Sequence, residues 1–312
     1  MSSEITIQDG RYYGPWRAPA NEGRATTGNI HSDDDARKLG FRGGLVAGSI
    51  HMEQFAPVLV RAFGERWLER GSLSLYFLTP TLHGEEVRAV VGEPPEGAAD
   101  AQVEAWAERP DGQRICEGTA SVGEPPELSA LRARQLERHP AGDPSTALRT
   151  RLRILANARA GGAFPVVETR VAPEAVAQRL EVITEPMPWY SDPARWGGIV
   201  PTSVNQVNAL IQPAYAYLQG RRADAIGLYG AIELRNVNGP MLVGKAYQAG
   251  GTLLHVGDTP KTEYLWFDTW ADDPSAPLRA GAGQRVAEMR MMLRFMKASS
   301  PLYQEAGAAA ER

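Results

Sequence analysis

Two apolar helices dominate the pattern of hydrophobic and polar positions along the chain. Apolar residues recur at steps of three and four from residue 49 onward, which places them on one broad face of a helix. The same spacing returns from residue 203 onward with almost no charge, so we expect the second helix to be wrapped on most sides. The recurring positions are Met52, Phe55, Ala56, Leu59, Phe63 and Trp67 in the first helix and Val204, Val207, Leu210, Ile211, Ala214, Tyr215 and Leu218 in the second.

A Gly-Gly turn and a serine precede each apolar stretch. Ser49 and Ser203 stand at the expected N-cap positions, where a hydroxyl can accept a hydrogen bond from a free amide of the first helical turn. The two stretches also resemble each other, because GGLVAGSI from Gly43 aligns without gaps with GGIVPTSV from Gly197. These segments lie about half a chain apart, so the pattern indicates an internal repeat.

Strand-like segments follow each predicted helix. They are separated by turn residues and carry the apolar and β-branched side chains that are typical of strands. A helix followed by a run of antiparallel strands predicts an α+β layer in which a sheet curls around the helix. The predicted strands cover residues 72–78, 86–91, 101–108 and 114–122 in the first half and 231–236, 243–256, 262–271 and 284–297 in the second.

The repeat divides the chain into two similar halves joined by a connecting segment. We expect the first half at residues 1–125, the connecting segment at 126–165 and the second half at 166–312. The connecting segment contains two short helical patterns, ELSALRARQLERH and STALRTRLRILANAR. A chain of 312 residues is long enough for such a pair of domains.

The charge balance excludes several classes of partner. The chain has 33 basic and 37 acidic residues and a net charge of −4, which is too balanced for a nucleic-acid surface or an anchor on an anionic membrane. The longest uncharged run, residues 196–220, contains Pro201 and Pro213, so it predicts a buried helix rather than a membrane span. We therefore expect a small-molecule ligand, no nucleic acid and no membrane.

The cysteine and histidine content argues against disulfides and metals. Cys116 is the single cysteine, so no intrachain disulfide and no cysteine metal cluster can form, and we expect it to be a buried apolar residue. A reducing, cytoplasmic setting is expected, since the N-terminus lacks the pattern of a signal peptide. The five histidines are scattered and predict no metal site. The sequence has no nucleotide-binding motif, so no cofactor is expected.

The densest group of chemistry-bearing side chains lies in NIHSDDDARKLGFRGGLVAGSIHMEQF, residues 29–55. His31 can exchange a proton near neutral pH, with a structural role as the alternative. Asp33 and Asp34 favour the dipole of a short helix after His31, or else they orient that histidine. His51 lies in the first turn of the apolar helix, where the positive helix end would keep it neutral and able to act as a base; a polar residue at the helix edge is the alternative.

The same stretch resembles a family motif. NIHSDDDARKLGFRGGLVAG is similar to a segment of the MaoC-like, R-specific enoyl-CoA hydratase and acyl dehydratase family, which reads Asp-x-Asn-Pro-x-His, then an acidic residue, Ala, Gly-Phe and a His-Gly before the helix. The Pro-x-x-x-Gly-Glu from Pro80 to Glu85 is similar to a feature of hot-dog proteins generally. The resemblance implies a tandem, or double, hot-dog fold with two curled antiparallel sheets, each wrapped around a long central helix.

The resemblance also implies an active site. In that family a histidine and an aspartate handle water and proton at an acyl thioester, while a backbone amide at the helix start holds the thioester oxygen. His31 matches the histidine and Gly48 matches the glycine that supplies the amide, with Ser49 beside it. Thr26 stands where the family has its aspartate, and Ala47 stands where it has the histidine before the glycine. The acid–base pair is therefore half present, and a replacement partner is needed.

Two further groups of residues have candidate binding roles. Trp189, Tyr190 and Trp196 precede the second apolar helix and either line a hydrophobic substrate channel or pack in the core. A basic stretch in the connecting segment either meets the phosphates of coenzyme A or an acyl carrier or forms a solvated surface. Its arginines are Arg149, Arg151, Arg153 and Arg159.

These features together predict a hydro-lyase, that is, a hydratase or dehydratase, acting on an acyl thioester or a related carbonyl-conjugated substrate. His31 is expected to transfer the proton, with His51 or an aspartate as its partner. A thioesterase, a non-catalytic protein that binds an acyl or other hydrophobic ligand, and an isomerase-type enzyme are the alternatives. The two halves already form a pseudo-dimer, so we expect a monomer or a homodimer.

Overall fold

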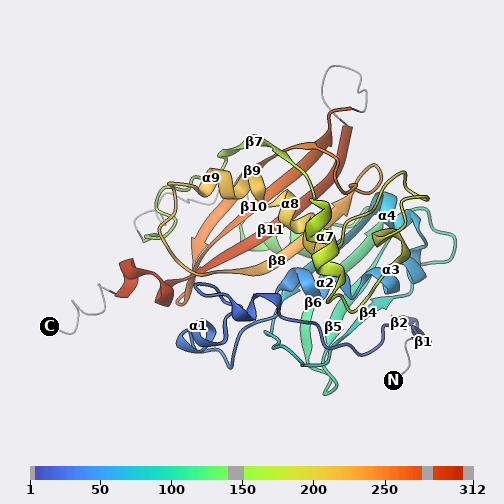
Figure 1. Ribbon diagram of the computed structural model, residues 1–312, viewed down its shortest axis with the longest axis horizontal. Coiled ribbons are helices and arrows are strands. Elements are labelled where there is room, and N and C mark those ends of the chain that lie inside the picture. The colour runs from blue at the N-terminus through green and yellow to red at the C-terminus, as the bar shows by residue number, and fades with distance from the viewer. Residues whose placement is uncertain (1–3, 140–150, 276–283, 305–312) are drawn as a thin grey trace.

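The computed structural model describes residues 4–139, 151–275 and 284–304. Within these ranges one antiparallel sheet of 11 strands runs through the molecule (Figure 1). Its strands are β1 (Thr6–Gln8), β2 (Arg11–Tyr13), β3 (Gly71–Phe77), β4 (Arg88–Gly92), β5 (Ala101–Glu108), β6 (Arg114–Val122), β7 (Ala163–Thr169), β8 (Gly227–Asn236), β9 (Tyr247–Asp258), β10 (Thr262–Asp273) and β11 (Gln284–Met296).

The order of the strands in space repeats between the two halves. Neighbouring strands follow the order β1-β2-β4-β5-β6-β3-β8-β11-β10-β9-β7. The first half therefore contains β3-β6-β5-β4 and the second half contains β8-β11-β10-β9, which is the same arrangement. The predicted strands overlap these eight, whereas β1, β2 and β7 were not predicted.

The two halves share a single sheet, so the expectation of two separate curled sheets is wrong. Strand β3 pairs with β8 in antiparallel register from Ser72 opposite Arg235 to Tyr76 opposite Ala231. Each of these strands would otherwise expose a row of unpaired backbone groups at a sheet edge. Their pairing joins the halves and removes both edges.

Short helices accompany the sheet. None of the helices within the described ranges has the length and apolar character needed to cross a membrane. The helices are α1 (Asp33–Lys38), α2 (Gly48–Glu53), α3 (Ala56–Phe63), α4 (Arg66–Arg70), α5 (Ala130–Arg138), α7 (Pro173–Leu180), α8 (Ser203–Leu210) and α9 (Gln212–Leu218), with the 3-10 turns η1 (Glu22–Ala25), η2 (Pro188–Tyr190) and η3 (Lys297–Ser299).

The long central helices that we expected are broken into shorter ones. The first apolar stretch forms α2, α3 and α4, and the second forms α8 and α9. Pro57 stands in the first turn of α3 and Pro213 in the first turn of α9. Proline has no amide hydrogen for an intrahelical bond, so each helix restarts at the proline rather than continuing through it.

The N-caps of the central helices also differ from the prediction. Ser49 and Ser203 lie inside α2 and α8, because the capping residues are Ala47 and Thr202. The Thr202 hydroxyl accepts the amide of Asn205 at 3.4 Å, whereas Ala47 has no side chain that could do the same. The start of α2 is therefore left without a side-chain cap.

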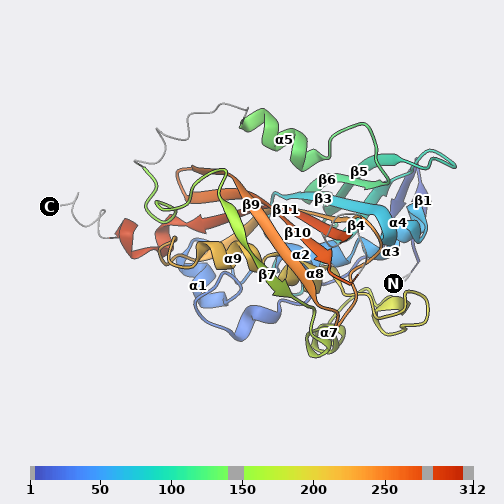
Figure 2. The ribbon, with the colours of Figure 1, turned by 90° about the horizontal axis from the view of Figure 1, so that it is seen from above.

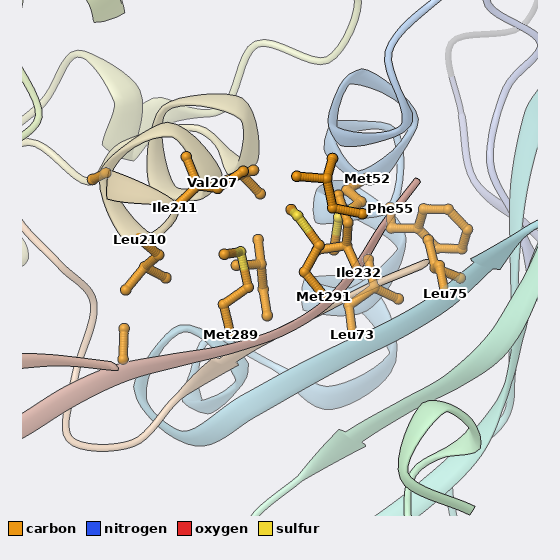
Figure 3. Close-up of a cluster of buried hydrophobic side chains, with 14 of the residues drawn as sticks. Met52, Phe55, Leu73, Leu75, Val207, Leu210, Ile211, Ile232, Met289 and Met291 are labelled. Atoms are coloured by element: carbon orange, nitrogen blue, oxygen red, sulfur yellow. The ribbon is translucent and has the colours of Figure 1, made fainter. Parts of the chain in front are cut away.

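The main hydrophobic core lies between the central helices and the inner face of the sheet (Figure 3). Side chains from the α2 region and from α8 point toward β3, β8 and β11 and meet between the layers. Burial of each large aliphatic side chain contributes about 1.5–3 kcal/mol. The labelled members of this cluster are Met52, Phe55, Leu73, Leu75, Val207, Leu210, Ile211, Ile232, Met289 and Met291.

Helix α5 covers the opposite face of the sheet (Figure 2). It forms the first helical pattern that we predicted in the connecting segment, and its Leu131 is buried in a second small apolar cluster with Tyr76 and Trp266. The second predicted pattern is not helical at residues 151–159, and its earlier part lies outside the described residues. Instead, the amides of residues 153–155 donate to the buried carboxylate of Glu263.

Candidate functional site

A cavity of 1420 Å³ lies between the two halves. The first half supplies one wall, which consists of the loop before α1, the residues before α2 and the end of β3. The facing wall comes from the second half, by α9, the start of β8 and the end of β11. The lining includes His31, Leu45, Gly48, His51, Phe77 and Thr81 from the first half and Arg222, Lys261 and Arg294 from the second.

His31 is half-buried and lines this cavity. Its Nδ1 lies 2.7 Å from the carbonyl oxygen of Leu45, just before α2. A carbonyl can only accept, so this contact assigns the ring proton to Nδ1. Nε2 is then the basic nitrogen, and it has no protein partner among the described residues.

Four residues around His31 form what we call the His31 cradle: Asn21, Gly23, Asn29 and Gly44. The Asn21 side-chain amide donates to the His31 carbonyl at 2.8 Å, and the Asn29 side-chain oxygen accepts the His31 amide at 2.8 Å. A Cβ added at Gly23 would lie 2.5 Å from the His31 Cβ, and one added at Gly44 would lie 1.9 Å from the His31 oxygen. The cradle therefore requires glycine at both positions. Sequence reasoning missed Asn21 and Gly23.

Gly48 begins α2 and lines the cavity, whereas Ser49 is buried and does not. No acceptor among the described residues contacts the amide of Gly48 or of Ser49. The ring of Phe77 rests on Gly48, because a Cβ added there would lie 2.4 Å from the Phe77 Cζ. The Gly48 amide is thus a free donor beside an aromatic wall.

His51 also reaches the cavity lining, but both of its ring nitrogens are occupied. Nδ1 lies 3.2 Å from Oε1 of Gln54, and Nε2 lies 2.5 Å from the Thr81 hydroxyl. Burial lowers the pKa of His51 to about 4, so the ring is neutral at pH 7. The neutral state was expected. The ring has no free nitrogen with which to act as the expected base. It instead holds Thr81 against α2.

The burial of His51 leads to a prediction about pH. Its pKa is about 4 in the folded protein, whereas histidine ordinarily has a pKa of 6.5, so the unfolded chain binds more protons between these values. Stability is therefore expected to fall as the pH drops from 6.5 to 4, by about 3 kcal/mol from this residue. Urea unfolding of the wild type and of His51→Gln across this range measures the difference. Equal pH slopes for the two proteins contradict the prediction.

Asp33 and Asp34 do not contact the His31 ring and do not line the cavity. Asp33 accepts the Gly44 amide at 2.8 Å and the Arg24 guanidinium at 2.9 Å, and these bonds lower its pKa. Asp34 is exposed, and its ion pair within the described ranges is with Arg37, at 3.6 Å. Their positions in the first turn of α1 agree with the dipole interpretation, and Asp33 also fixes the backbone of the His31 cradle.

Thr26, at the place of the family aspartate, belongs to an exposed turn. Its hydroxyl donates to the Gly23 carbonyl at 2.6 Å and accepts from the Asn29 side-chain amide at 2.6 Å. It does not line the cavity. Among the described residues no carboxylate lies within ion-pair distance of His31, so this histidine is the one free acid–base group on its side of the cavity.

The aromatic residues expected to form a channel lie elsewhere. Trp189 and Tyr190 are buried and border a separate pocket of only 30 Å³, while Trp196 packs against the main core. The Trp189 carbonyl accepts the amide of Val200 at 3.0 Å, which ties η2 to the start of α8. None of the three lines the large cavity, and the packing interpretation fits their positions.

The predicted basic stretch is also remote from the cavity. Arg149 lies outside the described residues. Arg151, Arg153 and Arg159 are exposed and do not line the cavity, and the Arg153 guanidinium stacks over Tyr303. Three other cationic residues lie in the lining, and all come from the second half: Arg222, Lys261 and Arg294.

The described residues contain no candidate metal site, and their one cysteine is not a reactive thiol. They contain no group of three or more His, Cys, Asp or Glu side chains that could hold a metal ion. Cys116 is fully buried in β6, as expected, and burial raises its pKa to about 12. His31 and the backbone amide of Gly48 are the candidate groups on the first-half wall of the cavity, while Glu168 and Asp224 line the wall from the second half.

Comparison with known proteins identifies the fold but no close relative. No family model matches the chain, and no curated protein matches it. A candidate dehydratase with a MaoC domain from Chloroflexus aurantiacus superposes with a TM-score of 0.58 at 11% identity, covering 91% of this chain and 93% of that one. A conserved protein of Mycobacterium tuberculosis described as a double hotdog fold gives 0.55 at 13% identity, over 95% and 96%.

A third structure, named as a MaoC-like dehydratase, has a TM-score of 0.53 at 15% identity and covers 94% of this chain and 98% of its own. At such low identities a shared structure is informative about the fold and not about the reaction. All three likenesses extend over nearly the full length of both chains. The chain therefore has the double hot-dog fold, with its two halves joined through one continuous sheet.

Proposed function

We propose that the protein adds water to, or removes water from, an acyl thioester or a related carbonyl-conjugated substrate, with His31 as the acid–base group. The observation that carries this proposal is the fixed tautomer of His31. Nδ1 is bound to the Leu45 carbonyl at 2.7 Å, and the basic Nε2 is left free beside a large cavity. Two structural neighbours named as MaoC dehydratases agree with this reaction class.

The reaction can be written with His31 alone. In the dehydration direction Nε2 takes the proton from the α carbon, and the electron pair moves toward the carbonyl oxygen. The Gly48 amide, at the positive end of α2, stabilises the charge on that oxygen. The imidazolium then returns its proton to the β-hydroxyl, which leaves as water while the carbon–carbon double bond forms. His31 ends neutral, so no second carboxylate is required.

The size of the cavity suits a large substrate. Pockets for drug-sized ligands have volumes of roughly 300–1000 Å³, and this cavity has 1420 Å³. An acyl group together with part of its carrier therefore fits. Thioesters of coenzyme A and of a pantetheine arm are the substrates to test.

A panel of 2-enoyl and 3-hydroxyacyl thioesters tests the proposal on the wild-type protein. We expect the conjugated double bond to disappear or to form, as followed by absorbance, with no free thiol released. Thiol release without a change in the double bond supports a thioesterase and rejects the hydro-lyase. The His31→Gln variant shows whether the activity depends on this site.

Non-catalytic binding of an acyl ligand is the second candidate function. The observation in its favour is the lack of any carboxylate partner for His31 among the described residues, although the related enzymes are expected to use an aspartate. Saturable binding of the same thioesters without turnover supports this alternative. Isothermal titration with the same panel measures binding, and the absorbance assay measures turnover. The two measurements together decide between the candidate functions.

A further inference from the structure

Arg179 is a buried arginine of the second half that contacts two carboxylates of the first half. It lies in α7, and its side chain is only 3% exposed. Its Nε and Nη2 donate to Oε2 of Glu53 at 2.9 and 2.7 Å, and its Nη1 donates to Oε2 of Glu22 at 2.5 Å. Charged side chains are rarely buried so completely unless they are paired on several sides.

Glu22 connects Arg179 to the His31 cradle. It is the first residue of η1 and lies between Asn21 and Gly23. Asn21 binds the His31 carbonyl at 2.8 Å, and the backbone of Gly23 lies against the His31 ring. A displacement of Glu22 therefore moves two of the residues on which His31 rests.

Glu53 connects Arg179 to the helix that supplies the Gly48 amide. It is the last residue of α2, and its Oε1 accepts the amide of Val204 at 3.4 Å, in the first turn of α8. The Arg179 guanidinium thus joins η1 to α2, and Glu53 extends this link to the start of α8. Of the two groups to which the proposed reaction assigns roles, Gly48 begins α2, and His31 rests on Asn21 and Gly23 at the start of η1.

We infer that Arg179 is a positioning residue for His31, which it holds in place through Glu22 and the His31 cradle. The effect of this role on kcat rests on the proposed function. Its effect on the position of the His31 ring does not. The planar guanidinium can bind both carboxylates at once, whereas a lysine would reach one of them. Arg179 itself lies outside the cavity lining and does not touch the substrate.

Glu22→Ala is the sharpest variant, because it removes the link to the His31 cradle and leaves the buried pair of Arg179 and Glu53 intact. The Glu22 side chain is 34% exposed, so its loss is compatible with folding. We expect kcat for thioester hydration to fall roughly 10- to 100-fold with little change in KM, since displaced catalytic groups lose transition-state stabilisation. Glu22→Gln keeps an acceptor oxygen and is expected to restore part of kcat, and Arg179→Lys is expected to be intermediate.

A second measurement does not depend on turnover. Nitrogen NMR of histidine-labelled protein reports the tautomer of each ring, and the His31 signal is assigned by its loss in His31→Gln. In Glu22→Ala we expect this signal to shift toward a mixture of tautomers, because the contact with the Leu45 carbonyl is no longer held. If wild type turns over no thioester, the proposed function fails, while this signal still tests the positioning role.

Arg132→Met is the matched control. Arg132 binds the buried Glu233 at 2.8 Å and also joins α5 to the second half. Helix α5 lies on the face of the sheet opposite to α2 and α9 (Figure 2), and Arg132 does not line the cavity. We expect its loss to lower stability while the His31 signal stays in place. An unchanged His31 signal in Glu22→Ala, or an equal change in Arg132→Met, overturns the inference.

Discussion

Replacing His31 with glutamine is expected to lower kcat/KM for thioester hydration by roughly 10²- to 10⁴-fold, which is the usual contribution of a general acid–base group. Glutamine can still donate from its amide to the Leu45 carbonyl, which lies 2.7 Å from Nδ1 in the wild type. It has no basic nitrogen to take the α-proton. The loss should therefore appear in kcat, and ligand binding in the cavity should persist.

The control for this variant is His139→Gln. His139 stacks on His255 with ring centroids 3.5 Å apart and does not line the cavity. We expect it to keep the wild-type rate, and circular dichroism should show that both variants are folded. A His31→Gln protein with a rate within about threefold of wild type contradicts the acid–base role.

Replacing Glu263 with alanine is expected to lower the free energy of unfolding by about 3–5 kcal/mol. Glu263 is fully buried in β10. Its carboxylate accepts the amides of Arg153, Ile154 and Leu155 at 2.7, 3.1 and 2.8 Å, and the Tyr303 hydroxyl at 2.6 Å. Alanine leaves these donors without an acceptor, and a buried donor without a partner costs about 1–3 kcal/mol.

Urea unfolding of Glu263→Ala measures this loss, and Glu104→Ala is the control. Glu104 has a side chain that is 53% exposed and pairs with Arg114 at 3.1 Å. An exposed ion pair contributes at most about 1 kcal/mol, so this variant should remain near wild type. If the two variants lose similar stability, the amides of residues 153–155 do not depend on Glu263.

The strands were predictable because their signal is local. Alternating side chains and turn residues define β5 and β6 with the predicted bounds. The Gly-Gly repeat indicated that β3 and β8 occupy equivalent places in the two halves. Pro57 and Pro213 also carry a local signal for the breaks in the central helices, but the apolar periodicity continues through both prolines and suggested unbroken helices. Periodicity reports which face is buried and not whether the hydrogen-bond ladder is continuous.

The candidate site was predictable only in part. The resemblance placed His31 and Gly48 near the start of the buried helix, and the structure has both in one cavity lining. It did not reveal that Thr81 occupies Nε2 of His51. It also did not reveal that Trp189 packs beside a different pocket. Such pairings depend on which distant segments meet after folding.

Hydrophobic period, turn residues and motif spacing are properties of neighbouring positions. They are therefore sufficient to predict the repeated α+β plan, the position of most strands and the stretch that carries His31. Three other features are visible only in the folded protein: which histidine has a free nitrogen, that both halves share one sheet, and that Arg179 reaches Glu22. These features arise from contacts between residues far apart in the chain. No local pattern encodes them, because burial and pairing are set when the two halves close on each other.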